Sequence, residues 1–171
     1  MFKIVEKRQL ADNIYEMKIA AERVARAALP GQFVIVRADE GGERIPLTIA
    51  DYDAEAGTVT IVTQTIGHST KKICSLEEGE SLVDFAGPLG RPSEFVHMPL
   101  EELKKRKYLF VAGGVGTAPV YPHAFLSGKT EQKQDGGRYF TRSALSFTGL
   151  SCYPVTGICV CYNEGIRRLF L

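Results

Sequence analysis

The feature that most limits the possible folds of this chain is a glycine-rich stretch after the apolar run at residues 108–112. Three glycines fall within residues 113–116 and are followed by Thr117 and Pro119. The pattern predicts a strand, a tight turn and a helix start, because a helix tolerates proline in its first turn. Backbone N–H groups there can face a phosphate without side chains intervening. Pro119 replaces the third glycine of a complete dinucleotide-binding motif, so a purely structural turn is the alternative.

Short strands joined by glycine and proline turns dominate the first part of the chain. Alternating and β-branched residues predict strands at residues 2–10, 13–20, 32–37, 44–52, 58–65 and 81–86. A helical piece is expected at residues 21–28, and a second after Gly67, with Ser69 or Thr70 as its N-cap. Many short strands with brief helices predict a small β-barrel over roughly residues 1–95.

Composition and charge argue against several classes of function. The net charge is +1 and 24% of the 171 residues are charged, so nucleic-acid binding is not expected as a main role. The basic cluster at residues 104–107 is better explained as a solvated helix end than as a binding patch. No apolar run approaches the length of about 18 residues that a membrane span needs, and the N-terminus shows no signal-peptide pattern. We therefore expect no membrane association and a cytoplasmic location.

Three segments of the predicted barrel carry groups that suit a dinucleotide. Arg44 precedes a strand with Thr48; a guanidinium can hold a diphosphate through two hydrogen bonds, and a hydroxyl can bond a flat heterocycle. Residues 67–70 would place hydroxyls and unpaired N–H groups at a helix start. The third segment is residues 87–90, which contain two glycines and a proline. Taken singly, each has a structural alternative: an edge-strand arginine, a helix cap and a turn.

In this order, the segments resemble the ferredoxin–NADP reductase superfamily, in which a flavin-binding barrel precedes a nicotinamide-nucleotide domain. The likeness spans about residues 1–122 and also rests on Pro30-Gly31-Gln32-Phe33 and Val120-Tyr121-Pro122. It is closest to a branch that includes the small subunit of NADH-dependent ferredoxin:NADP oxidoreductase and the dihydroorotate dehydrogenase B electron-transfer subunit. The resemblance implies a six-stranded antiparallel Greek-key barrel at residues 1–98 and an incomplete α/β nucleotide-binding domain at residues 99–171.

The resemblance also implies the residues that contact the cofactors. Many relatives place the arginine one position later, at Ile45 in this chain. No protein acid, base or nucleophile is required, because the cofactors carry the bond chemistry. The residues implied for FAD are Arg44, Pro46, Leu47, Thr48, Val62, Thr63, Gln64, Gly67, Ser69 and Thr70, and those implied for NAD(P)H are Gly113, Gly114, Gly116 and Thr117.

The function implied is that of an electron-transfer subunit. Hydride would pass from NAD(P)H to the flavin, and single electrons onward to an iron–sulfur centre. The expected partners are a larger iron–sulfur flavoprotein subunit and ferredoxin. The alternative, from another class, is a truncated, non-catalytic barrel that serves as a binding or assembly module.

The tail departs from the resemblance from about residue 123. Relatives carry the rest of the nucleotide domain and a cysteine cluster for a [2Fe–2S] centre, which needs about four closely spaced thiolates. Here Cys152, Cys159 and Cys161 are separated by six residues and then one. Only residues 157–162 predict a strand. The hypothesis is that truncation, a shifted reading frame or another alteration makes this tail foreign to the family.

Overall fold

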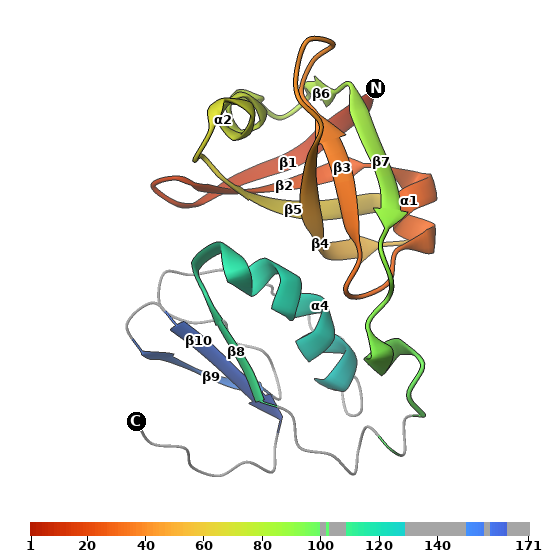
Figure 1. Ribbon diagram of the computed structural model, residues 1–171, viewed down its shortest axis with the longest axis vertical. Helices are drawn as coiled ribbons and strands as arrows, with labels where there is room; N and C mark the ends of the chain where they lie inside the picture. Colours follow the sequence, from red (N-terminus) through yellow and green to blue (C-terminus); the bar gives the residue numbers. More distant parts are fainter. Residues whose placement is uncertain (100–101, 103–108, 129–149, 156–157, 164–171) are drawn as a thin grey trace.

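The barrel predicted for the first part of the chain is present. The computed structural model describes residues 1–99, 102, 109–128, 150–155 and 158–163, and Figure 1 shows the strands of the first part curling around a common centre. These strands are β1 (Phe2–Ala11), β2 (Ile14–Ala20), β3 (Phe33–Arg37), β4 (Ile45–Asp53), β5 (Thr58–Gln64), β6 (Ser81–Leu82) and β7 (Asp84–Leu89).

The strand order identifies a Greek-key barrel. The antiparallel order is β6-β1-β2-β5-β4-β3-β7, in which β7 returns by a long connection to lie beside β3. The two edge strands, β6 and β7, are separated in the chain only by Val83. The backbone itself therefore joins the two edges, and the sheet is nearly closed. The predicted barrel of six antiparallel strands is confirmed by the six longer strands, to which β6 adds a two-residue pair.

The core follows from the alternation along the strands. Ile4, Met17 and Ile19 are fully buried from β1 and β2, and Val59 and Ile61 from β5. Both faces of β5 are covered, which explains its nearly continuous run of β-branched residues. Helix α1 (Glu22–Ala27) contacts β4, β5 and β7 and buries two side chains, Val24 and Ala25, before the turn that precedes β3.

Helix α2 (His68–Ser75) follows β5 and begins earlier than the sequence predicts. Its N-cap is Gly67, so the prediction of Ser69 or Thr70 as the cap is wrong. Thr70 lies one turn inside the helix, and its Oγ1 accepts hydrogen bonds from the N–H groups of Ile66 and Gly67, both at 3.0 Å. The threonine hydroxyl thus folds back on the helix start from within, which a cap position would not allow.

Cys74 on α2 is a free, buried thiol. Burial raises its pKa to about 11, although nearby Lys7 acts in the opposite direction. The thiol packs with the apolar core, and its Sγ lies 3.9 Å from the carbonyl oxygen of Thr63.

The second part of the chain begins with the predicted strand, glycine turn and helix. The elements are the short helix η1 (Glu94–Val96) in the linker, β8 (Leu109–Gly113), η2 (Gly114–Gly116), α4 (Thr117–Gly128), β9 (Leu150–Val155) and β10 (Ile158–Asn163). Helix α4 lies between the barrel and the sheet β8-β10-β9 (Figure 1) and contacts β4, β8 and β10. No helix in the described ranges is long and apolar enough to cross a membrane.

In the described residues, the strand that pairs with β8 is antiparallel to it, so these two strands do not form a βαβ unit. The predicted strand near residues 157–162 is confirmed as β10, but it pairs antiparallel with β8, from Ile158 opposite Gly113 to Tyr162 opposite Leu109. A βαβ crossover requires parallel strands. β9, which the sequence did not predict, forms a hairpin with β10.

The barrel core generates a direct stability prediction. Replacing Ile61, which is 0% exposed, with alanine should lower the free energy of unfolding by about 2–5 kcal/mol, because it removes buried methyl groups and leaves a cavity. Urea denaturation followed by circular dichroism measures the change. Ile66→Ala is the matched control, since Ile66 is 74% exposed and should change stability by less than about 0.5 kcal/mol. Equal effects of the two substitutions would contradict the assigned core.

Candidate functional site

The antiparallel fold brings most of the predicted FAD residues to one end of the barrel. β4 begins where β5 ends, and the pairing between them starts at Ile49 opposite Ile61. Residues 46–48 therefore lie on the strand next to residues 62–64, and α2 follows β5 after three residues. Segments that are about 20 residues apart in the chain become neighbours in space.

The two strands do not pair with each other at this end. Residues 46–48 pair only with β3, as in Thr48 opposite Phe33, and residues 62–64 pair only with β2, as in Thr63 opposite Tyr15. In an ordinary sheet, the facing N–H and C=O groups of adjacent strands would bond to each other. Among the described residues, the backbone groups of Thr48 and Val62 that face the other strand therefore have no ladder partner there.

The side chains at this end differ in exposure. Pro46 is exposed, whereas Leu47, Thr48 and Gln64 are half-buried. Val62 is 6% exposed and packs in a small cluster with Ala50 and Ala118. Thr63 is 1% exposed, and its buried Oγ1 has no hydrogen-bond partner among the residues that the structure describes. Val62 could therefore reach a ligand mainly through its backbone, whereas the backbone of Thr63 pairs with Tyr15 on β2.

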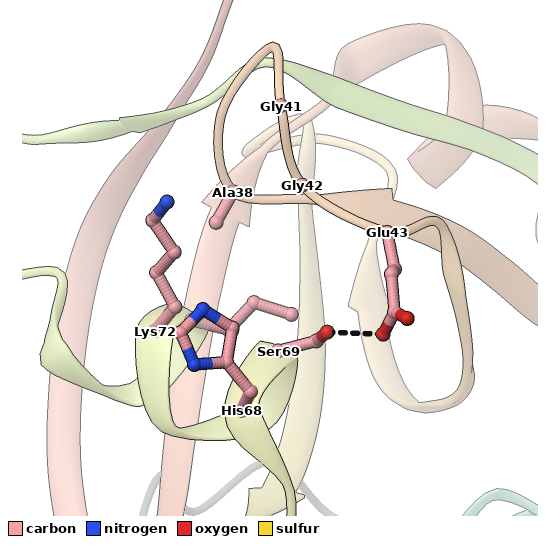
Figure 2. Close-up of a pocket in the computed structure, with 8 residues that line it drawn as sticks. Ala38, Gly41, Gly42, Glu43, His68, Ser69 and Lys72 are labelled. Carbon is pink, nitrogen blue, oxygen red and sulfur yellow. Dashed lines mark hydrogen bonds between the residues drawn. The ribbon is translucent and has the colours of Figure 1, made fainter.

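A pocket of about 280 Å³ lies between the β3–β4 loop and the first turns of α2. Figure 2 shows that the side chains of His68, Ser69 and Lys72 come from α2 and that Glu43 approaches from the loop. The Ser69 hydroxyl donates to Glu43 Oε2 at 2.5 Å. The lining residues are Ala38, Gly41, Gly42, Glu43, His68, Ser69, Lys72 and Ile73.

The predicted diphosphate ligand Arg44 is turned toward β7. Its Nη2 lies 2.7 Å from Asp84 Oδ2, and Arg37 Nε lies 2.7 Å from the same oxygen. Arg37 also donates from Nη1 to the Glu40 carbonyl at 2.9 Å. One carboxylate thus faces two guanidinium groups, which leaves an excess positive charge. The Arg44 side chain is 60% exposed, so it can exchange partners at little cost.

Asp39 fixes the β3–β4 loop against α2. Its Oδ1 accepts from the Gly41 N–H at 3.0 Å, its carbonyl accepts from the Gly42 N–H at 3.0 Å, and its Oδ2 pairs with Lys72. The hydrogen bond from Lys72, with smaller contributions from the Lys72 charge and the glycine N–H groups, lowers the pKa of Asp39 despite some desolvation. This ion pair holds the loop beside the pocket.

The predicted nucleotide turn lies next to the same end of the barrel. Gly113 ends β8, Gly114 and Gly116 bound η2, and Thr117 begins α4. Val115 packs against the cluster of Ala50, Val62 and Ala118, which joins α4 to β4 and β5. A Cβ built on Gly116 would meet no atom within 4 Å, so the space beside it is open.

Two further motif segments have structural roles. Gln32 is buried; its Oε1 accepts from the Leu29 N–H at 2.9 Å and its Nε2 donates to the Gly90 carbonyl at 3.3 Å. Gly31 has φ +92°, and a Cβ there would lie 3.0 Å from Ser93 N. These contacts hold the segments at residues 30–33 and 87–90 together.

Sequence reasoning missed the polar residues around the pocket. These residues are Asp39, Glu43, His68, Lys72 and Asp84. Their partners are distant in the chain, so no local spacing could indicate them. The only signal was that Glu43 adjoins Arg44 and His68 adjoins Ser69. In the part of the chain with described side chains, no group of three or more His, Cys, Asp or Glu could hold a metal ion.

Comparison with known structures defines the class of protein. Over 75% of its length, the chain superposes on the structure of an NADH-dependent reduced ferredoxin–NADP oxidoreductase, with a TM-score of 0.64 and 33% identity, and covers 44% of that chain. The barrel is the FAD-binding fold of ferredoxin reductase-like proteins. No protein-family model matches the chain.

Comparison with curated sequences narrows the relationship. The chain is 40% identical over 121 residues to the Thermotoga maritima dihydroorotate dehydrogenase B (NAD(+)) electron transfer subunit homolog. It is 62% identical over 122 residues to a Clostridium beijerinckii protein named "uncharacterized protein in adh 3'region". About 70% of the chain is homologous to dihydroorotate dehydrogenase B electron transfer subunits, which are subunits of heteromeric oxidoreductases. The matched region spans only 40% and 41% of these two relatives.

The ion pair between Asp39 and Lys72 can be tested by titration. Lys72→Met should raise the pKa of Asp39 back toward 3.8, because the main cause of the lowered value is lost. A lowered pKa stabilises the fold above the unfolded-state pKa, and this contribution disappears as the pH falls through the folded-state value. NMR titration of the Asp39 carboxyl carbon measures the pKa in the wild type and in the variant. Lys71→Met removes the same charge one residue away and should leave Asp39 unchanged; equal shifts in both variants would rule out the specific pair.

Proposed function

We propose that this chain is the FAD-binding electron-transfer subunit of an NAD(P)H-linked flavin and iron–sulfur oxidoreductase. The observation that carries the proposal is the unpaired end of β4 and β5, which lies beside the hydroxyl-bearing start of α2 and the glycine turn. The homology to electron-transfer subunits of ferredoxin reductase-like flavoproteins supports the same conclusion.

The isoalloxazine ring would lie along the facing edges of β4 and β5. Backbone groups of Thr48 and Val62, which face the gap between the two strands, can bond its polar edge, and the Thr48 hydroxyl adds a further donor and acceptor. Because Val62 is buried, it would contribute backbone groups alone, and Thr63, whose backbone pairs with Tyr15, would act by holding the strand in place. These strands are rigid and paired on their outer sides, so they can hold the ring in a fixed orientation.

The diphosphate of FAD would lie at the start of α2. The first N–H groups of a helix have no intrahelical partner and favour negative charge. Ser69 supplies a hydroxyl, and Gly67, with no atom within 4 Å of a built Cβ, allows close approach of the ligand. Thr70 would act indirectly, since its Oγ1 already shapes the turn by accepting from the Ile66 and Gly67 N–H groups. Arg44 would join the diphosphate by leaving Asp84.

The nicotinamide nucleotide would bind at Gly113, Gly114, Gly116 and Thr117. The packing of Val115 and Ala118 against Ala50 and Val62 supports this role, because it keeps the turn close to the flavin end of the barrel. When bound, FAD would accept a hydride and release electrons singly, and the chain would supply binding and orientation. We propose a boundary between barrel and nucleotide domain near residue 98.

The proposed partners follow from this chemistry. Electrons would pass to a larger iron–sulfur flavoprotein subunit or to ferredoxin, and the compartment would be the cytoplasm, where NAD(P)H is available. We assign no [2Fe–2S] centre to this chain itself.

Binding of FAD by the purified chain tests the proposal. The protein should be yellow, and Thr48→Ala and Ser69→Ala should each weaken FAD binding by about 1–3 kcal/mol, because each removes one polar contact. Equilibrium titration followed by flavin fluorescence measures the affinity. Ser75→Ala is the control, since its hydroxyl donates to the Lys72 carbonyl at the far end of α2. A colourless protein that still bound a partner subunit would favour the assembly module, and unchanged affinity in both variants would show that the flavin lies elsewhere.

A further inference from the structure

The carboxylate of Glu43 holds the hydroxyl that the proposed diphosphate site needs. Ser69 Oγ donates to Glu43 Oε2 at 2.5 Å, across 26 residues of sequence, and Figure 2 shows this bond at the side of the pocket. A hydrogen bond to an ionised acceptor is about twice as strong as a neutral one. The Ser69 hydroxyl has a single proton to donate, so it cannot serve Glu43 and a phosphate oxygen at once.

The loop can release Glu43 without losing its own structure. Asp39 maintains the turn through the Gly41 and Gly42 N–H groups and pairs with Lys72 on α2. On the other side of Glu43, Arg44 pairs with Asp84. Glu43 itself is exposed and follows two glycines, so rotation of its side chain leaves the contacts of Asp39 in place. The bond between Glu43 and Ser69 is therefore a separable element of the loop.

The charges beside Ser69 oppose an incoming diphosphate. The Glu43 carboxylate and a phosphate are both anions, and like charges a few ångströms apart near a protein surface repel each other appreciably. Lys72 offsets this repulsion little, because Asp39 already neutralises it. The Glu43 carboxylate thus accepts the hydrogen bond that a phosphate oxygen of the ligand would accept, and it has the same sign of charge.

We propose that Glu43 sets the cofactor affinity of this chain by competing with the FAD diphosphate for Ser69. The inference rests on the proposed function and deepens it. Cofactor binding then requires Glu43 to leave Ser69, which slows association and weakens the complex. Removal of the Glu43 charge, with the side-chain length kept, makes FAD bind faster and more tightly.

The test compares two charge removals on the same loop. Glu43→Gln should lower the Kd for FAD by about three- to tenfold, mostly through a higher association rate constant, measured by stopped-flow flavin fluorescence. The gain should shrink at high ionic strength. Glu40→Gln removes the same charge three residues away, from a side chain that does not line the pocket, and should leave the Kd unchanged. In the Ser69→Ala background, the gain from Glu43→Gln should be smaller, because the competition for the hydroxyl is gone and only the charge repulsion remains.

The outcomes separate this inference from the proposed function. If the wild-type chain binds FAD and Glu43→Gln binds it equally or more weakly, Glu43 is a bystander or a ligand, and the inference fails alone. If Glu40→Gln gains as much as Glu43→Gln, the effect is general electrostatics, and the inference also fails. If Glu43→Gln binds FAD and the wild type does not, the competition is supported in its strongest form. If neither binds FAD, the proposed function and the inference fail together.

Discussion

The point at which β4 and β5 separate controls what this barrel can do. A nearly closed antiparallel sheet satisfies its backbone groups internally, and such a surface offers little to a polar ligand. Here the ladder between the two strands stops at Ile49 and Ile61, while each strand continues along its outer neighbour. The result is a pair of rigid edges with free donors and acceptors, next to the start of α2. The proposed flavin site requires no distortion of the fold, because the unpaired edges are part of it.

Small side chains let the second part of the chain approach this end closely. Ala50, Val62 and Ala118 form the contact between β4, β5 and α4, with Val115 from the glycine turn packed against them. Alanine on two of the three elements allows the backbones to come near each other. Larger residues at positions 50 or 118 would move the glycine turn away from the barrel, although neither alanine carries a functional group. The spacing between the two proposed cofactor sites is thus set by apolar packing.

Features that depend on neighbouring residues in the chain were predictable from the sequence, whereas features that depend on contacts between distant residues were not. The strands of the barrel and the glycine turn depend on local propensity and alternation, and these were predictable from the sequence. The start of α2 was missed because Thr70 can act as a cap or from within the first turn, and only the geometry distinguishes these roles. The antiparallel pairing of β10 was missed because strand direction depends on tertiary context. Pairs such as Ser69 with Glu43 join residues whose local sequences give no sign of contact.

The polar groups around the pocket divide into anchors and exchangeable contacts. Asp39 combines an ion pair with two backbone bonds in one turn, so its loss would affect the loop itself. Arg37 is similarly held by both Asp84 and the Glu40 carbonyl. Arg44 and Glu43 are themselves exposed, each with one partner, and exposed ion pairs contribute at most about 1 kcal/mol. They are also the groups with the charges that a diphosphate would attract or repel. The loop therefore keeps its shape through the groups that do not meet the ligand, while adjacent residues of opposite charge remain free to respond to it.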